Sequence, residues 1–152
     1  MNENFKKAAD KMPLLPQSLS EQSPICIGDI GITDVPQKGV YVFFENNKPI
    51  YVGRSNRMKA RLKEHSQRSS DHYSATLAVR IAKKDISTPY KGKTTKQLME
   101  DSIFHNKFEA AKSKIAKTRI RFIEIEDQAE QAMFEMYAIL ALNTEFNDFG
   151  TH

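Results

Sequence analysis

The chain of 152 residues lacks the features that mark membrane proteins and disulfide-stabilised secreted proteins. No apolar run approaches the ~20 residues that a membrane span needs, and no apolar segment of the signal-peptide type follows Met1. Cys26 is the single cysteine, which excludes an intrachain disulfide and a cysteine-based zinc site. We therefore expect a cytoplasmic protein that does not bind membranes.

Acidic residues are outnumbered by basic ones in the middle of the chain. Residues 39–70 carry seven Lys and Arg against two acids, and residues 71–117 carry ten against five. Residues 118–152 reverse this balance, with two against seven. A basic middle suits a polyanionic partner such as nucleic acid, and the acidic end offers carboxylates to a cation. A solvated surface without a partner would give the same charge pattern.

The length is typical of one domain with a modest core. Residues 1–38 hold four of the six prolines and predict an N-terminal arm, with a short helix over residues 4–11. In this arm, the run Ile25-Cys26-Ile27 can add an edge strand. The remainder, residues 39–152, is expected to form the functional domain.

Helical periodicity predicts two helices in the middle of this domain. One is expected over residues 72–84, with Tyr73, Leu77 and Ile81 facing inward. The other is expected over residues 94–115, and its inward residues are Phe104, Phe108, Ala111 and Ile115. Together they make residues 72–117 a helical insertion.

The last two expected elements are a strand over residues 118–126 and a helix over residues 128–142, which Asp127 caps. The apolar residues of this strand change phase at Phe122-Ile123, which indicates either a bulge or cover on both faces. The inward face of the helix is predicted at Ala129, Met133, Met136 and Leu140, with Glu135 at its edge.

The segment Gly39–His65 has the densest set of chemically useful groups. Two strand-like runs, Val40–Phe44 and Ile50–Val52, flank Asn46-Asn47, which can adopt the positive φ angles of a tight hairpin turn. Ser55 or Asn56 can cap the helix that follows. On that helix Met58 and Leu62 face inward, and four basic residues are expected to form one exposed stripe. These are Arg57, Arg61, His65 and Arg68.

The segment resembles the GIY-YIG endonuclease family, which is named after two tripeptides on adjacent strands. Here these tripeptides are Gly39-Val40-Tyr41 and Tyr51-Val52-Gly53. The arginine, the histidine or tyrosine four residues later, the glutamate and the asparagine of the family match Arg61, His65, Glu135 and Asn147. The resemblance spans about residues 38–147 and leaves the middle unmatched.

The resemblance implies a small α/β (α+β) fold, a mainly antiparallel three-stranded sheet flanked by helices. It implies a metal-dependent endonuclease in which Glu135 holds Mg²⁺ or Mn²⁺ and Asn147 braces the site. By this analogy Tyr41, with Tyr51 beside it, is a candidate general base or a group that orients the nucleophile. His65 is the rival base or a proton relay, because histidine ordinarily titrates near neutrality.

Chemistry of the residue types supports two of these roles. One carboxylate together with waters and phosphate oxygens is a common way to hold Mg²⁺. The guanidinium of Arg61 matches a phosphate with two hydrogen bonds, as lysine cannot. Further phosphate contacts are expected from Arg54, Arg57, Arg68, Lys107, Lys112 and Lys114. The expected partner is nucleic acid, foremost DNA, and the alternative is a non-catalytic nucleic-acid-binding module on the same scaffold.

Overall fold

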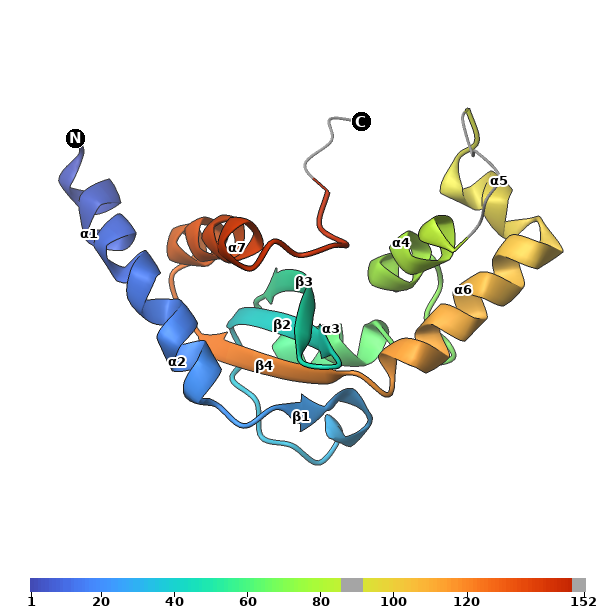
Figure 1. Cartoon of the computed structure of the whole chain (residues 1–152), viewed down its shortest axis with the longest axis horizontal. Coiled ribbons are helices and arrows are strands. Elements are labelled where there is room, and N and C mark those ends of the chain that lie inside the picture. Colours follow the sequence, from blue (N-terminus) through green and yellow to red (C-terminus); the bar gives the residue numbers. More distant parts are fainter. Residues whose placement is uncertain (86–91, 149–152) are drawn as a thin grey trace.

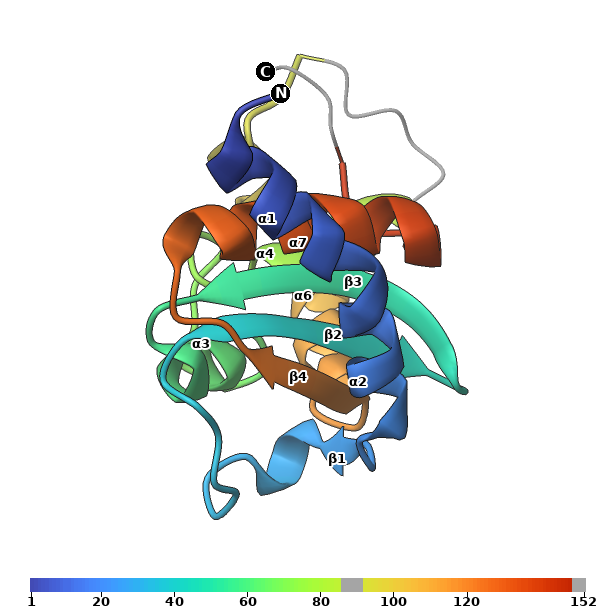
Figure 2. The same cartoon turned by 90° about the vertical axis from the view of Figure 1, so that its left-hand side faces the viewer.

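The computed structural model describes residues 1–85 and 92–148, so the end of the expected domain at residues 149–152 lies outside the described residues. Within these ranges, one antiparallel sheet has the strand order β1-β4-β2-β3, which Figure 2 shows from bottom to top. The strands are β1 (Ile25–Cys26), β2 (Gly39–Glu45), β3 (Lys48–Ser55) and β4 (Arg119–Glu124). The α+β class with an antiparallel sheet is confirmed. The count of three strands is corrected to four, because the arm adds β1 to the edge of β4.

The turn between β2 and β3 forms as its two asparagines predict. Asn46 and Asn47 have φ angles of 50° and 63°, which permit the tight connection. In the resulting ladder Tyr41 lies opposite Gly53, and Phe43 lies opposite Tyr51. The two tyrosines of the tripeptides therefore share one face of the sheet.

The register of β4 explains its change of apolar phase. Residues 119–124 pair with residues 44–39 of β2 without a shift, so the ladder between these strands has no bulge. Phe122 packs against one hydrophobic core and Ile123 against the other. Cover on both faces is thus the correct alternative.

Helices lie on both sides of the sheet. Figure 1 shows α1, α2 and α7 gathered on one side, and α4, α5 and α6 on the other. Their bounds are α1 (Glu3–Lys11), α2 (Leu15–Glu21), α3 (Met58–Glu64), α4 (Thr76–Lys84), α5 (Thr95–Met99), α6 (Ser102–Ile115) and α7 (Gln128–Leu142). Short 3₁₀ turns occupy Met12–Leu14 and Ile27–Asp29. Among the described residues, no helix has both the length and the apolar character to cross a membrane.

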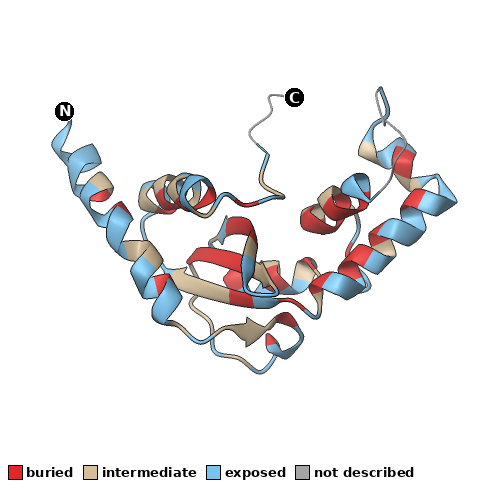
Figure 3. Ribbon diagram, viewed as in Figure 1, coloured by how far each residue is buried: buried red, intermediate tan, exposed pale blue. Residues whose placement is uncertain are grey.

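Two hydrophobic cores form because both faces of the sheet are apolar. The first core joins Tyr41 and Phe43 to α4 and α6, including the predicted inward residues of α6 (Phe104, Phe108, Ala111 and Ile115). The second joins Val40 and Val42 to α7. Figure 3 shows buried residues concentrated in the strands and on the inner faces of α4 and α6.

Three helix predictions need correction. The helix expected over residues 94–115 is divided, because the Asp101 side chain accepts the amides of Ile103 and Phe104 and starts α6 anew. Helix α4 begins at Thr76 rather than at residue 72, which leaves Tyr73 outside it and exposed, whereas Leu77 and Ile81 are buried as predicted.

The inward face of α7 also differs from the prediction, which is right only at Met133, a half-buried residue that packs against the second core. Asp127 caps the helix as predicted, by accepting the Glu130 amide. Its buried residues, however, are Gln131, Phe134, Ala138 and Ile139, whereas Met136 and Leu140 are exposed and Ala129 lies on the surface. Glu135 still lies at the edge of the buried face, next to this shifted stripe.

Candidate active site

Both glycines of the tripeptides make room for other groups. The ring of Tyr41 crosses Gly53 so closely that a Cβ atom there would lie 2.5 Å from the tyrosine Cζ and Oη atoms. A Cβ on Gly39, whose φ is 155°, would lie 2.0 Å from the carbonyl oxygen of Ile123. A larger residue at either position would displace the ring or the neighbouring strand. The glycines therefore fix where the Tyr41 hydroxyl is held.

The Tyr41 hydroxyl meets His65 beneath the sheet. Tyr41 Oη and His65 Nε2 are 2.9 Å apart and share a hydrogen bond. The imidazole is fully buried and lies edge-on to the rings of Tyr41, Phe43 and Tyr51. His65 follows the last residue of α3 and faces inward together with Met58 and Leu62.

The expected exposed stripe on this helix is therefore wrong. Helix α3 ends at Glu64, so Arg68 lies beyond it, and His65 belongs to the core. Of the four stripe residues, Arg57 and Arg68 are exposed, and Arg61 is half-buried. The spacing of Met58, Leu62 and His65 at i, i+4 and i+7 is the signal that places the imidazole inside.

Burial changes the acid–base properties of both partners. Burial, and then the positive charge of Arg61, lower the pKa of His65 from 6.5 to about 3. Burial is also the main cause that raises the pKa of Tyr41 above its ordinary value, while Arg61 opposes this rise. At neutral pH the pair is thus a neutral imidazole beside a neutral phenol. This corrects the expectation that His65 titrates near neutrality.

Arg61 is held by the loop that precedes α4. Its Nη1 donates to the carbonyl oxygen of Ser74 at 2.6 Å, and its Nη2 donates to Thr76 Oγ1 at 3.1 Å. Nη1 also contacts Glu64 Oε2 at 3.2 Å. The same carboxylate binds Arg57 through two hydrogen bonds. These contacts fix the plane of the Arg61 guanidinium and leave it at the edge of the tyrosine pair.

Glu135 lies in a small pocket, which we call the catalytic pocket. It has a volume of about 230 Å³, and its lining includes Tyr51, Arg80, Glu135 and Asn147. Glu135 Oε2 accepts a hydrogen bond from Arg54 Nε at 3.0 Å. Burial raises the pKa of Glu135, and the Arg54 charge works against this rise. The pKa of Tyr41 responds to charges on Tyr51, Arg61 and Glu135, so these groups share one electrostatic neighbourhood.

Asn147 and Arg80 both line the catalytic pocket and are held there by hydrogen bonds to backbone groups. Asn147 exchanges two hydrogen bonds of 2.8 Å with the backbone of Val52, and so pairs with the open edge of β3. Arg80 donates to the carbonyl oxygen of Phe146 at 2.6 Å, and its guanidinium lies 5.9 Å from the centre of the Tyr51 ring. Arg80 was not predicted as a site residue. In the sequence, the only indication that Arg80 belongs to the site is its position four residues after Thr76.

The donor set of the catalytic pocket fits a divalent cation of the magnesium type. Glu135 supplies a half-buried carboxylate, and Asp148 adds a second carboxylate to the lining of the same pocket. In residues 1–85 and 92–148, no group of three or more His, Cys, Asp and Glu side chains gathers to form a metal site. A cation held by one or two carboxylates completes its shell with waters and substrate phosphates, which is the usual arrangement for Mg²⁺.

The predicted phosphate contacts divide into free and engaged side chains. Arg54 and Arg57 are paired with Glu135 and Glu64, and Lys114 is paired with Glu45. Arg68 and Lys107 are exposed. Lys112 is buried, and its Nζ donates to the carbonyl oxygens of Arg68 and Ser70 at 2.8 and 2.9 Å. Lys112 therefore holds the chain internally, and we remove it from the binding surface.

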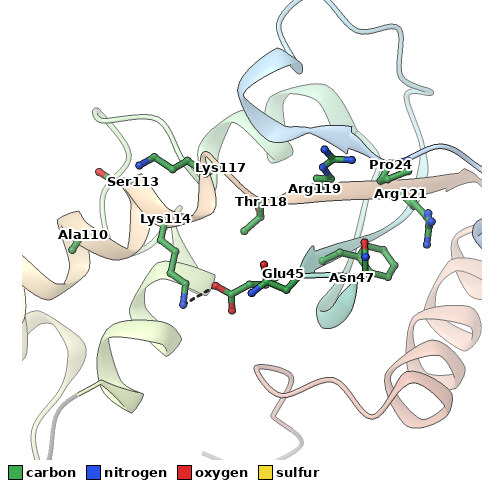
Figure 4. Close-up of a pocket in the computed structure, with 12 residues that line it drawn as sticks. Pro24, Glu45, Asn47, Ala110, Ser113, Lys114, Lys117, Thr118, Arg119 and Arg121 are labelled. Carbon is green, nitrogen blue, oxygen red and sulfur yellow. Dashed lines mark ion pairs between the residues drawn. The ribbon is translucent and has the colours of Figure 1, made fainter.

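A larger pocket lies beyond the turn of the β2–β3 hairpin, and we call it the hairpin pocket. It has a volume of about 620 Å³. Figure 4 shows Lys114, Lys117, Arg119 and Arg121 around it, with Lys114 joined to Glu45 by an ion pair of 2.9 Å. None of the proposed catalytic residues lines this pocket among the described residues.

Comparison with known proteins agrees with the geometry of the tyrosine hairpin. The family model of the GIY-YIG catalytic domain matches residues 37–147. This range includes both tripeptides, Arg61, His65, Glu135 and Asn147. Searches of curated proteins and of solved structures gave no match. The chain belongs to the GIY-YIG family of catalytic domains, whose characteristic activity is nuclease cleavage of nucleic acid.

Proposed function

We propose that this protein is a metal-dependent endonuclease that hydrolyses phosphodiester bonds, with DNA as its first expected substrate. The observation that carries the proposal is that four unlike groups surround Tyr41, either in direct contact with it or close enough to shift its pKa. They are the buried imidazole of His65, the phenol of Tyr51, the braced guanidinium of Arg61 and the half-buried carboxylate of Glu135.

Arg61 is suited to hold the scissile phosphate. Its guanidinium is positioned by Ser74 and Thr76 before substrate arrives, so little freedom is lost when a phosphate binds. Negative charge grows on the phosphate oxygens during attack by water. A fixed cation stabilises this charge more than it stabilises the ground state.

Tyr41 and His65 together provide a way to remove the proton from the attacking water. A buried phenol with a raised pKa does not ionise at neutral pH, so Tyr41 is not a phenolate base. In the proposed relay, Tyr41 accepts a proton from the attacking water while its own hydroxyl proton passes to His65 Nε2, 2.9 Å away. The phosphate on Arg61 offsets part of the positive charge that lowers the pKa of His65.

The catalytic pocket supplies the remaining functions. Tyr51 forms its wall and orients the attacking water, and Asn147 fixes the strand edge that carries Tyr51. Glu135 is the residue that would hold Mg²⁺ or Mn²⁺. Such a cation supplies positive charge to the phosphate and to the leaving oxygen.

The alternative is a non-catalytic nucleic-acid-binding module on the same scaffold. A binding module gains nothing from a carboxylate in its site, because the negative charge of Glu135 repels phosphate. A buried phenol–imidazole pair likewise does not contribute to the binding of nucleic acid by such a module. Both features favour the enzyme.

The test is whether the purified chain nicks supercoiled plasmid DNA in the presence of Mg²⁺ or Mn²⁺. We expect nicked and linear products with either cation, and none after EDTA is added. A parallel reaction with an RNA of the same sequence compares the two substrate classes. Tight DNA binding without cleavage under either cation would overturn the proposal and favour the binding module.

A further inference from the structure

Tyr73 is an exposed aromatic side chain on the loop between α3 and α4. It is 70% exposed, and Phe5 is the other exposed aromatic among the described residues. The loop is rigidly built, because Asp71 Oδ1 accepts the amides of both Tyr73 and Ser74. The imidazole of His72 lies against the phenol ring, with ring centres 4.0 Å apart and a tilt of 39°. The two paired rings therefore form a fixed aromatic surface that is exposed to water.

This surface lies directly beside the proposed phosphate clamp. The residue that follows Tyr73, Ser74, accepts the hydrogen bond of Arg61 Nη1 through its carbonyl oxygen. Thr76, two residues further, accepts from Nη2. A phosphate on Arg61 would therefore place the next nucleotide of the same strand within reach of the Tyr73 ring.

A basic pocket surrounds the two rings. It has a volume of about 470 Å³, and its lining includes His72, Tyr73, Arg80, Lys83 and Lys96. Arg80 also lines the catalytic pocket, so the two pockets are neighbours. Among the described lining residues there are three Lys and Arg and no acid. His72 Nε2 is buried and has no hydrogen-bond partner in the described part of the chain.

We infer that His72 and Tyr73 form a stacking platform for an unpaired nucleobase next to the bond that is cleaved. Aromatic rings between cations are typical of sites that bind single strands, because every base offers a flat face to stack on. In an intact duplex that face is covered by the neighbouring base pairs. The substrate thus carries an unpaired nucleotide at the cut site, in a single strand, a gap or a junction.

This inference rests on the proposed function, because it names the substrate class of the same site. The alternative occupant is an apolar segment of a protein partner. The three surrounding cations would not contribute to the binding of an apolar segment, whereas they attract phosphates. The observations therefore favour nucleic acid.

The test uses the absence of tryptophan from the chain. The variant Tyr73→Trp carries a single indole on the platform, and Phe5→Trp carries one on the exposed face of α1 as a matched control. Both full-length variants are titrated in EDTA, so that no metal-dependent cleavage occurs, with an oligothymidine strand and with a blunt duplex of equal length. We expect quenching of the Tyr73→Trp fluorescence by the single strand and little by the duplex. Phe5→Trp should respond to neither.

Binding measured by anisotropy gives an independent readout. Tyr73→Ala should lower the affinity for the single strand by about tenfold and the affinity for the duplex less than twofold. Its thermal midpoint should match the wild type, because the side chain is exposed. Equal loss on both substrates, or no loss and no quenching, would overturn the platform. Failure of the nuclease proposal is distinguishable, because it would appear as absent cleavage with quenching retained.

Discussion

The hairpin pocket and the catalytic pocket both contain basic side chains, and they differ in what accompanies the positive charge. The hairpin pocket holds Lys114, Lys117, Arg119 and Arg121, but its acid, Glu45, is neutralised by Lys114. The catalytic pocket is little more than a third of that size and brings two carboxylates, a phenol, an amide and a guanidinium together. Volume and positive charge are enough to attract an anion. Hydrolysis requires unlike groups at fixed positions, which the smaller pocket has.

The comparison is sharpest at the groups that move protons. Tyr41→Phe removes one oxygen from the proposed relay, and His65→Gln removes the acceptor behind it. Each change should lower the rate of single-turnover cleavage by about 100-fold or more. The double variant should lose little beyond either single variant, because the two residues act as one unit.

A change in the hairpin pocket provides the control for this experiment. Arg119→Gln should leave the single-turnover rate within about twofold of wild type, as is usual for surface substitutions away from a site. Circular dichroism and thermal midpoints show whether the buried variants are folded. A fully active Tyr41→Phe enzyme, or losses that multiply in the double variant, would refute the relay.

The next effect compares two arginines, one in each region. Arg61→Lys keeps the charge but loses the fork that holds Ser74, Thr76 and, by the proposal, the phosphate. We expect about a 100-fold loss of kcat/KM, the range found when one transition-state donor is removed. Arg119→Lys in the hairpin pocket should change kcat/KM less than twofold. Equal effects at both positions would abolish the distinction between the pockets.

The pH dependence of the free energy of unfolding also distinguishes the site around His65 from the hairpin pocket. The pKa of His65 is about 3 in the folded protein and about 6.5 when exposed, so between these values only the unfolded chain takes up the proton. Stability should therefore fall as pH drops below about 6.5, by about 2 kcal/mol at pH 5. Urea unfolding of wild type and His65→Gln at pH 7 and pH 5 measures this difference.

The His65→Gln variant should lose about 2 kcal/mol less than wild type between these two pH values. Arg119→Gln leaves the buried imidazole of His65 in place, so this variant should follow the wild-type dependence. If His65→Gln and wild type lose the same free energy, the histidine is not held neutral by burial.

The smallest effect is expected from reversing charge in the hairpin pocket. The double variant Lys117→Glu, Arg119→Glu should weaken DNA binding by a few-fold for all sequences alike. It should flatten the slope of log affinity against log salt by about one unit for each lost phosphate contact. The cleavage rate at saturating DNA should stay at the wild-type value. A tenfold loss of that rate would place the hairpin pocket in the catalytic machinery.

Local chemistry explains why part of the fold was predictable. The asparagine turn, the Asp127 cap of α7 and the inward residues of α6 each depend on neighbours close in sequence. The face of α7 was not predictable in this way. The helix contacts β3, β2 and the N-terminal arm, so apolar residues occur around most of its circumference and several stripes fit equally well.

The site shows the same division. The order of the motif residues placed Tyr41, Tyr51, Arg61 and Glu135 correctly on their elements. The protonation state of His65 depends on its burial against three aromatic rings. The charged residues that surround His65 in the sequence obscure this burial. Arg80 lies beside Tyr51, and Ser74 beside Arg61, only because α4 and the loop before it fold back over these residues. Such long-range placement has no local signature.

In the proposed mechanism, metal-dependent cleavage by this domain depends on Glu135, and one pair of variants shows whether it does. Glu135→Gln keeps the shape of the side chain but removes its charge. Glu130→Gln makes the same change on the same helix, at a residue paired with Lys11 outside the pocket. Plasmid cleavage in Mg²⁺ and DNA binding in EDTA are measured for both. We predict that Glu135→Gln loses cleavage and binds DNA as tightly as wild type or slightly more tightly, while Glu130→Gln cleaves normally. Mg²⁺-dependent cleavage by Glu135→Gln at the wild-type rate would contradict the account.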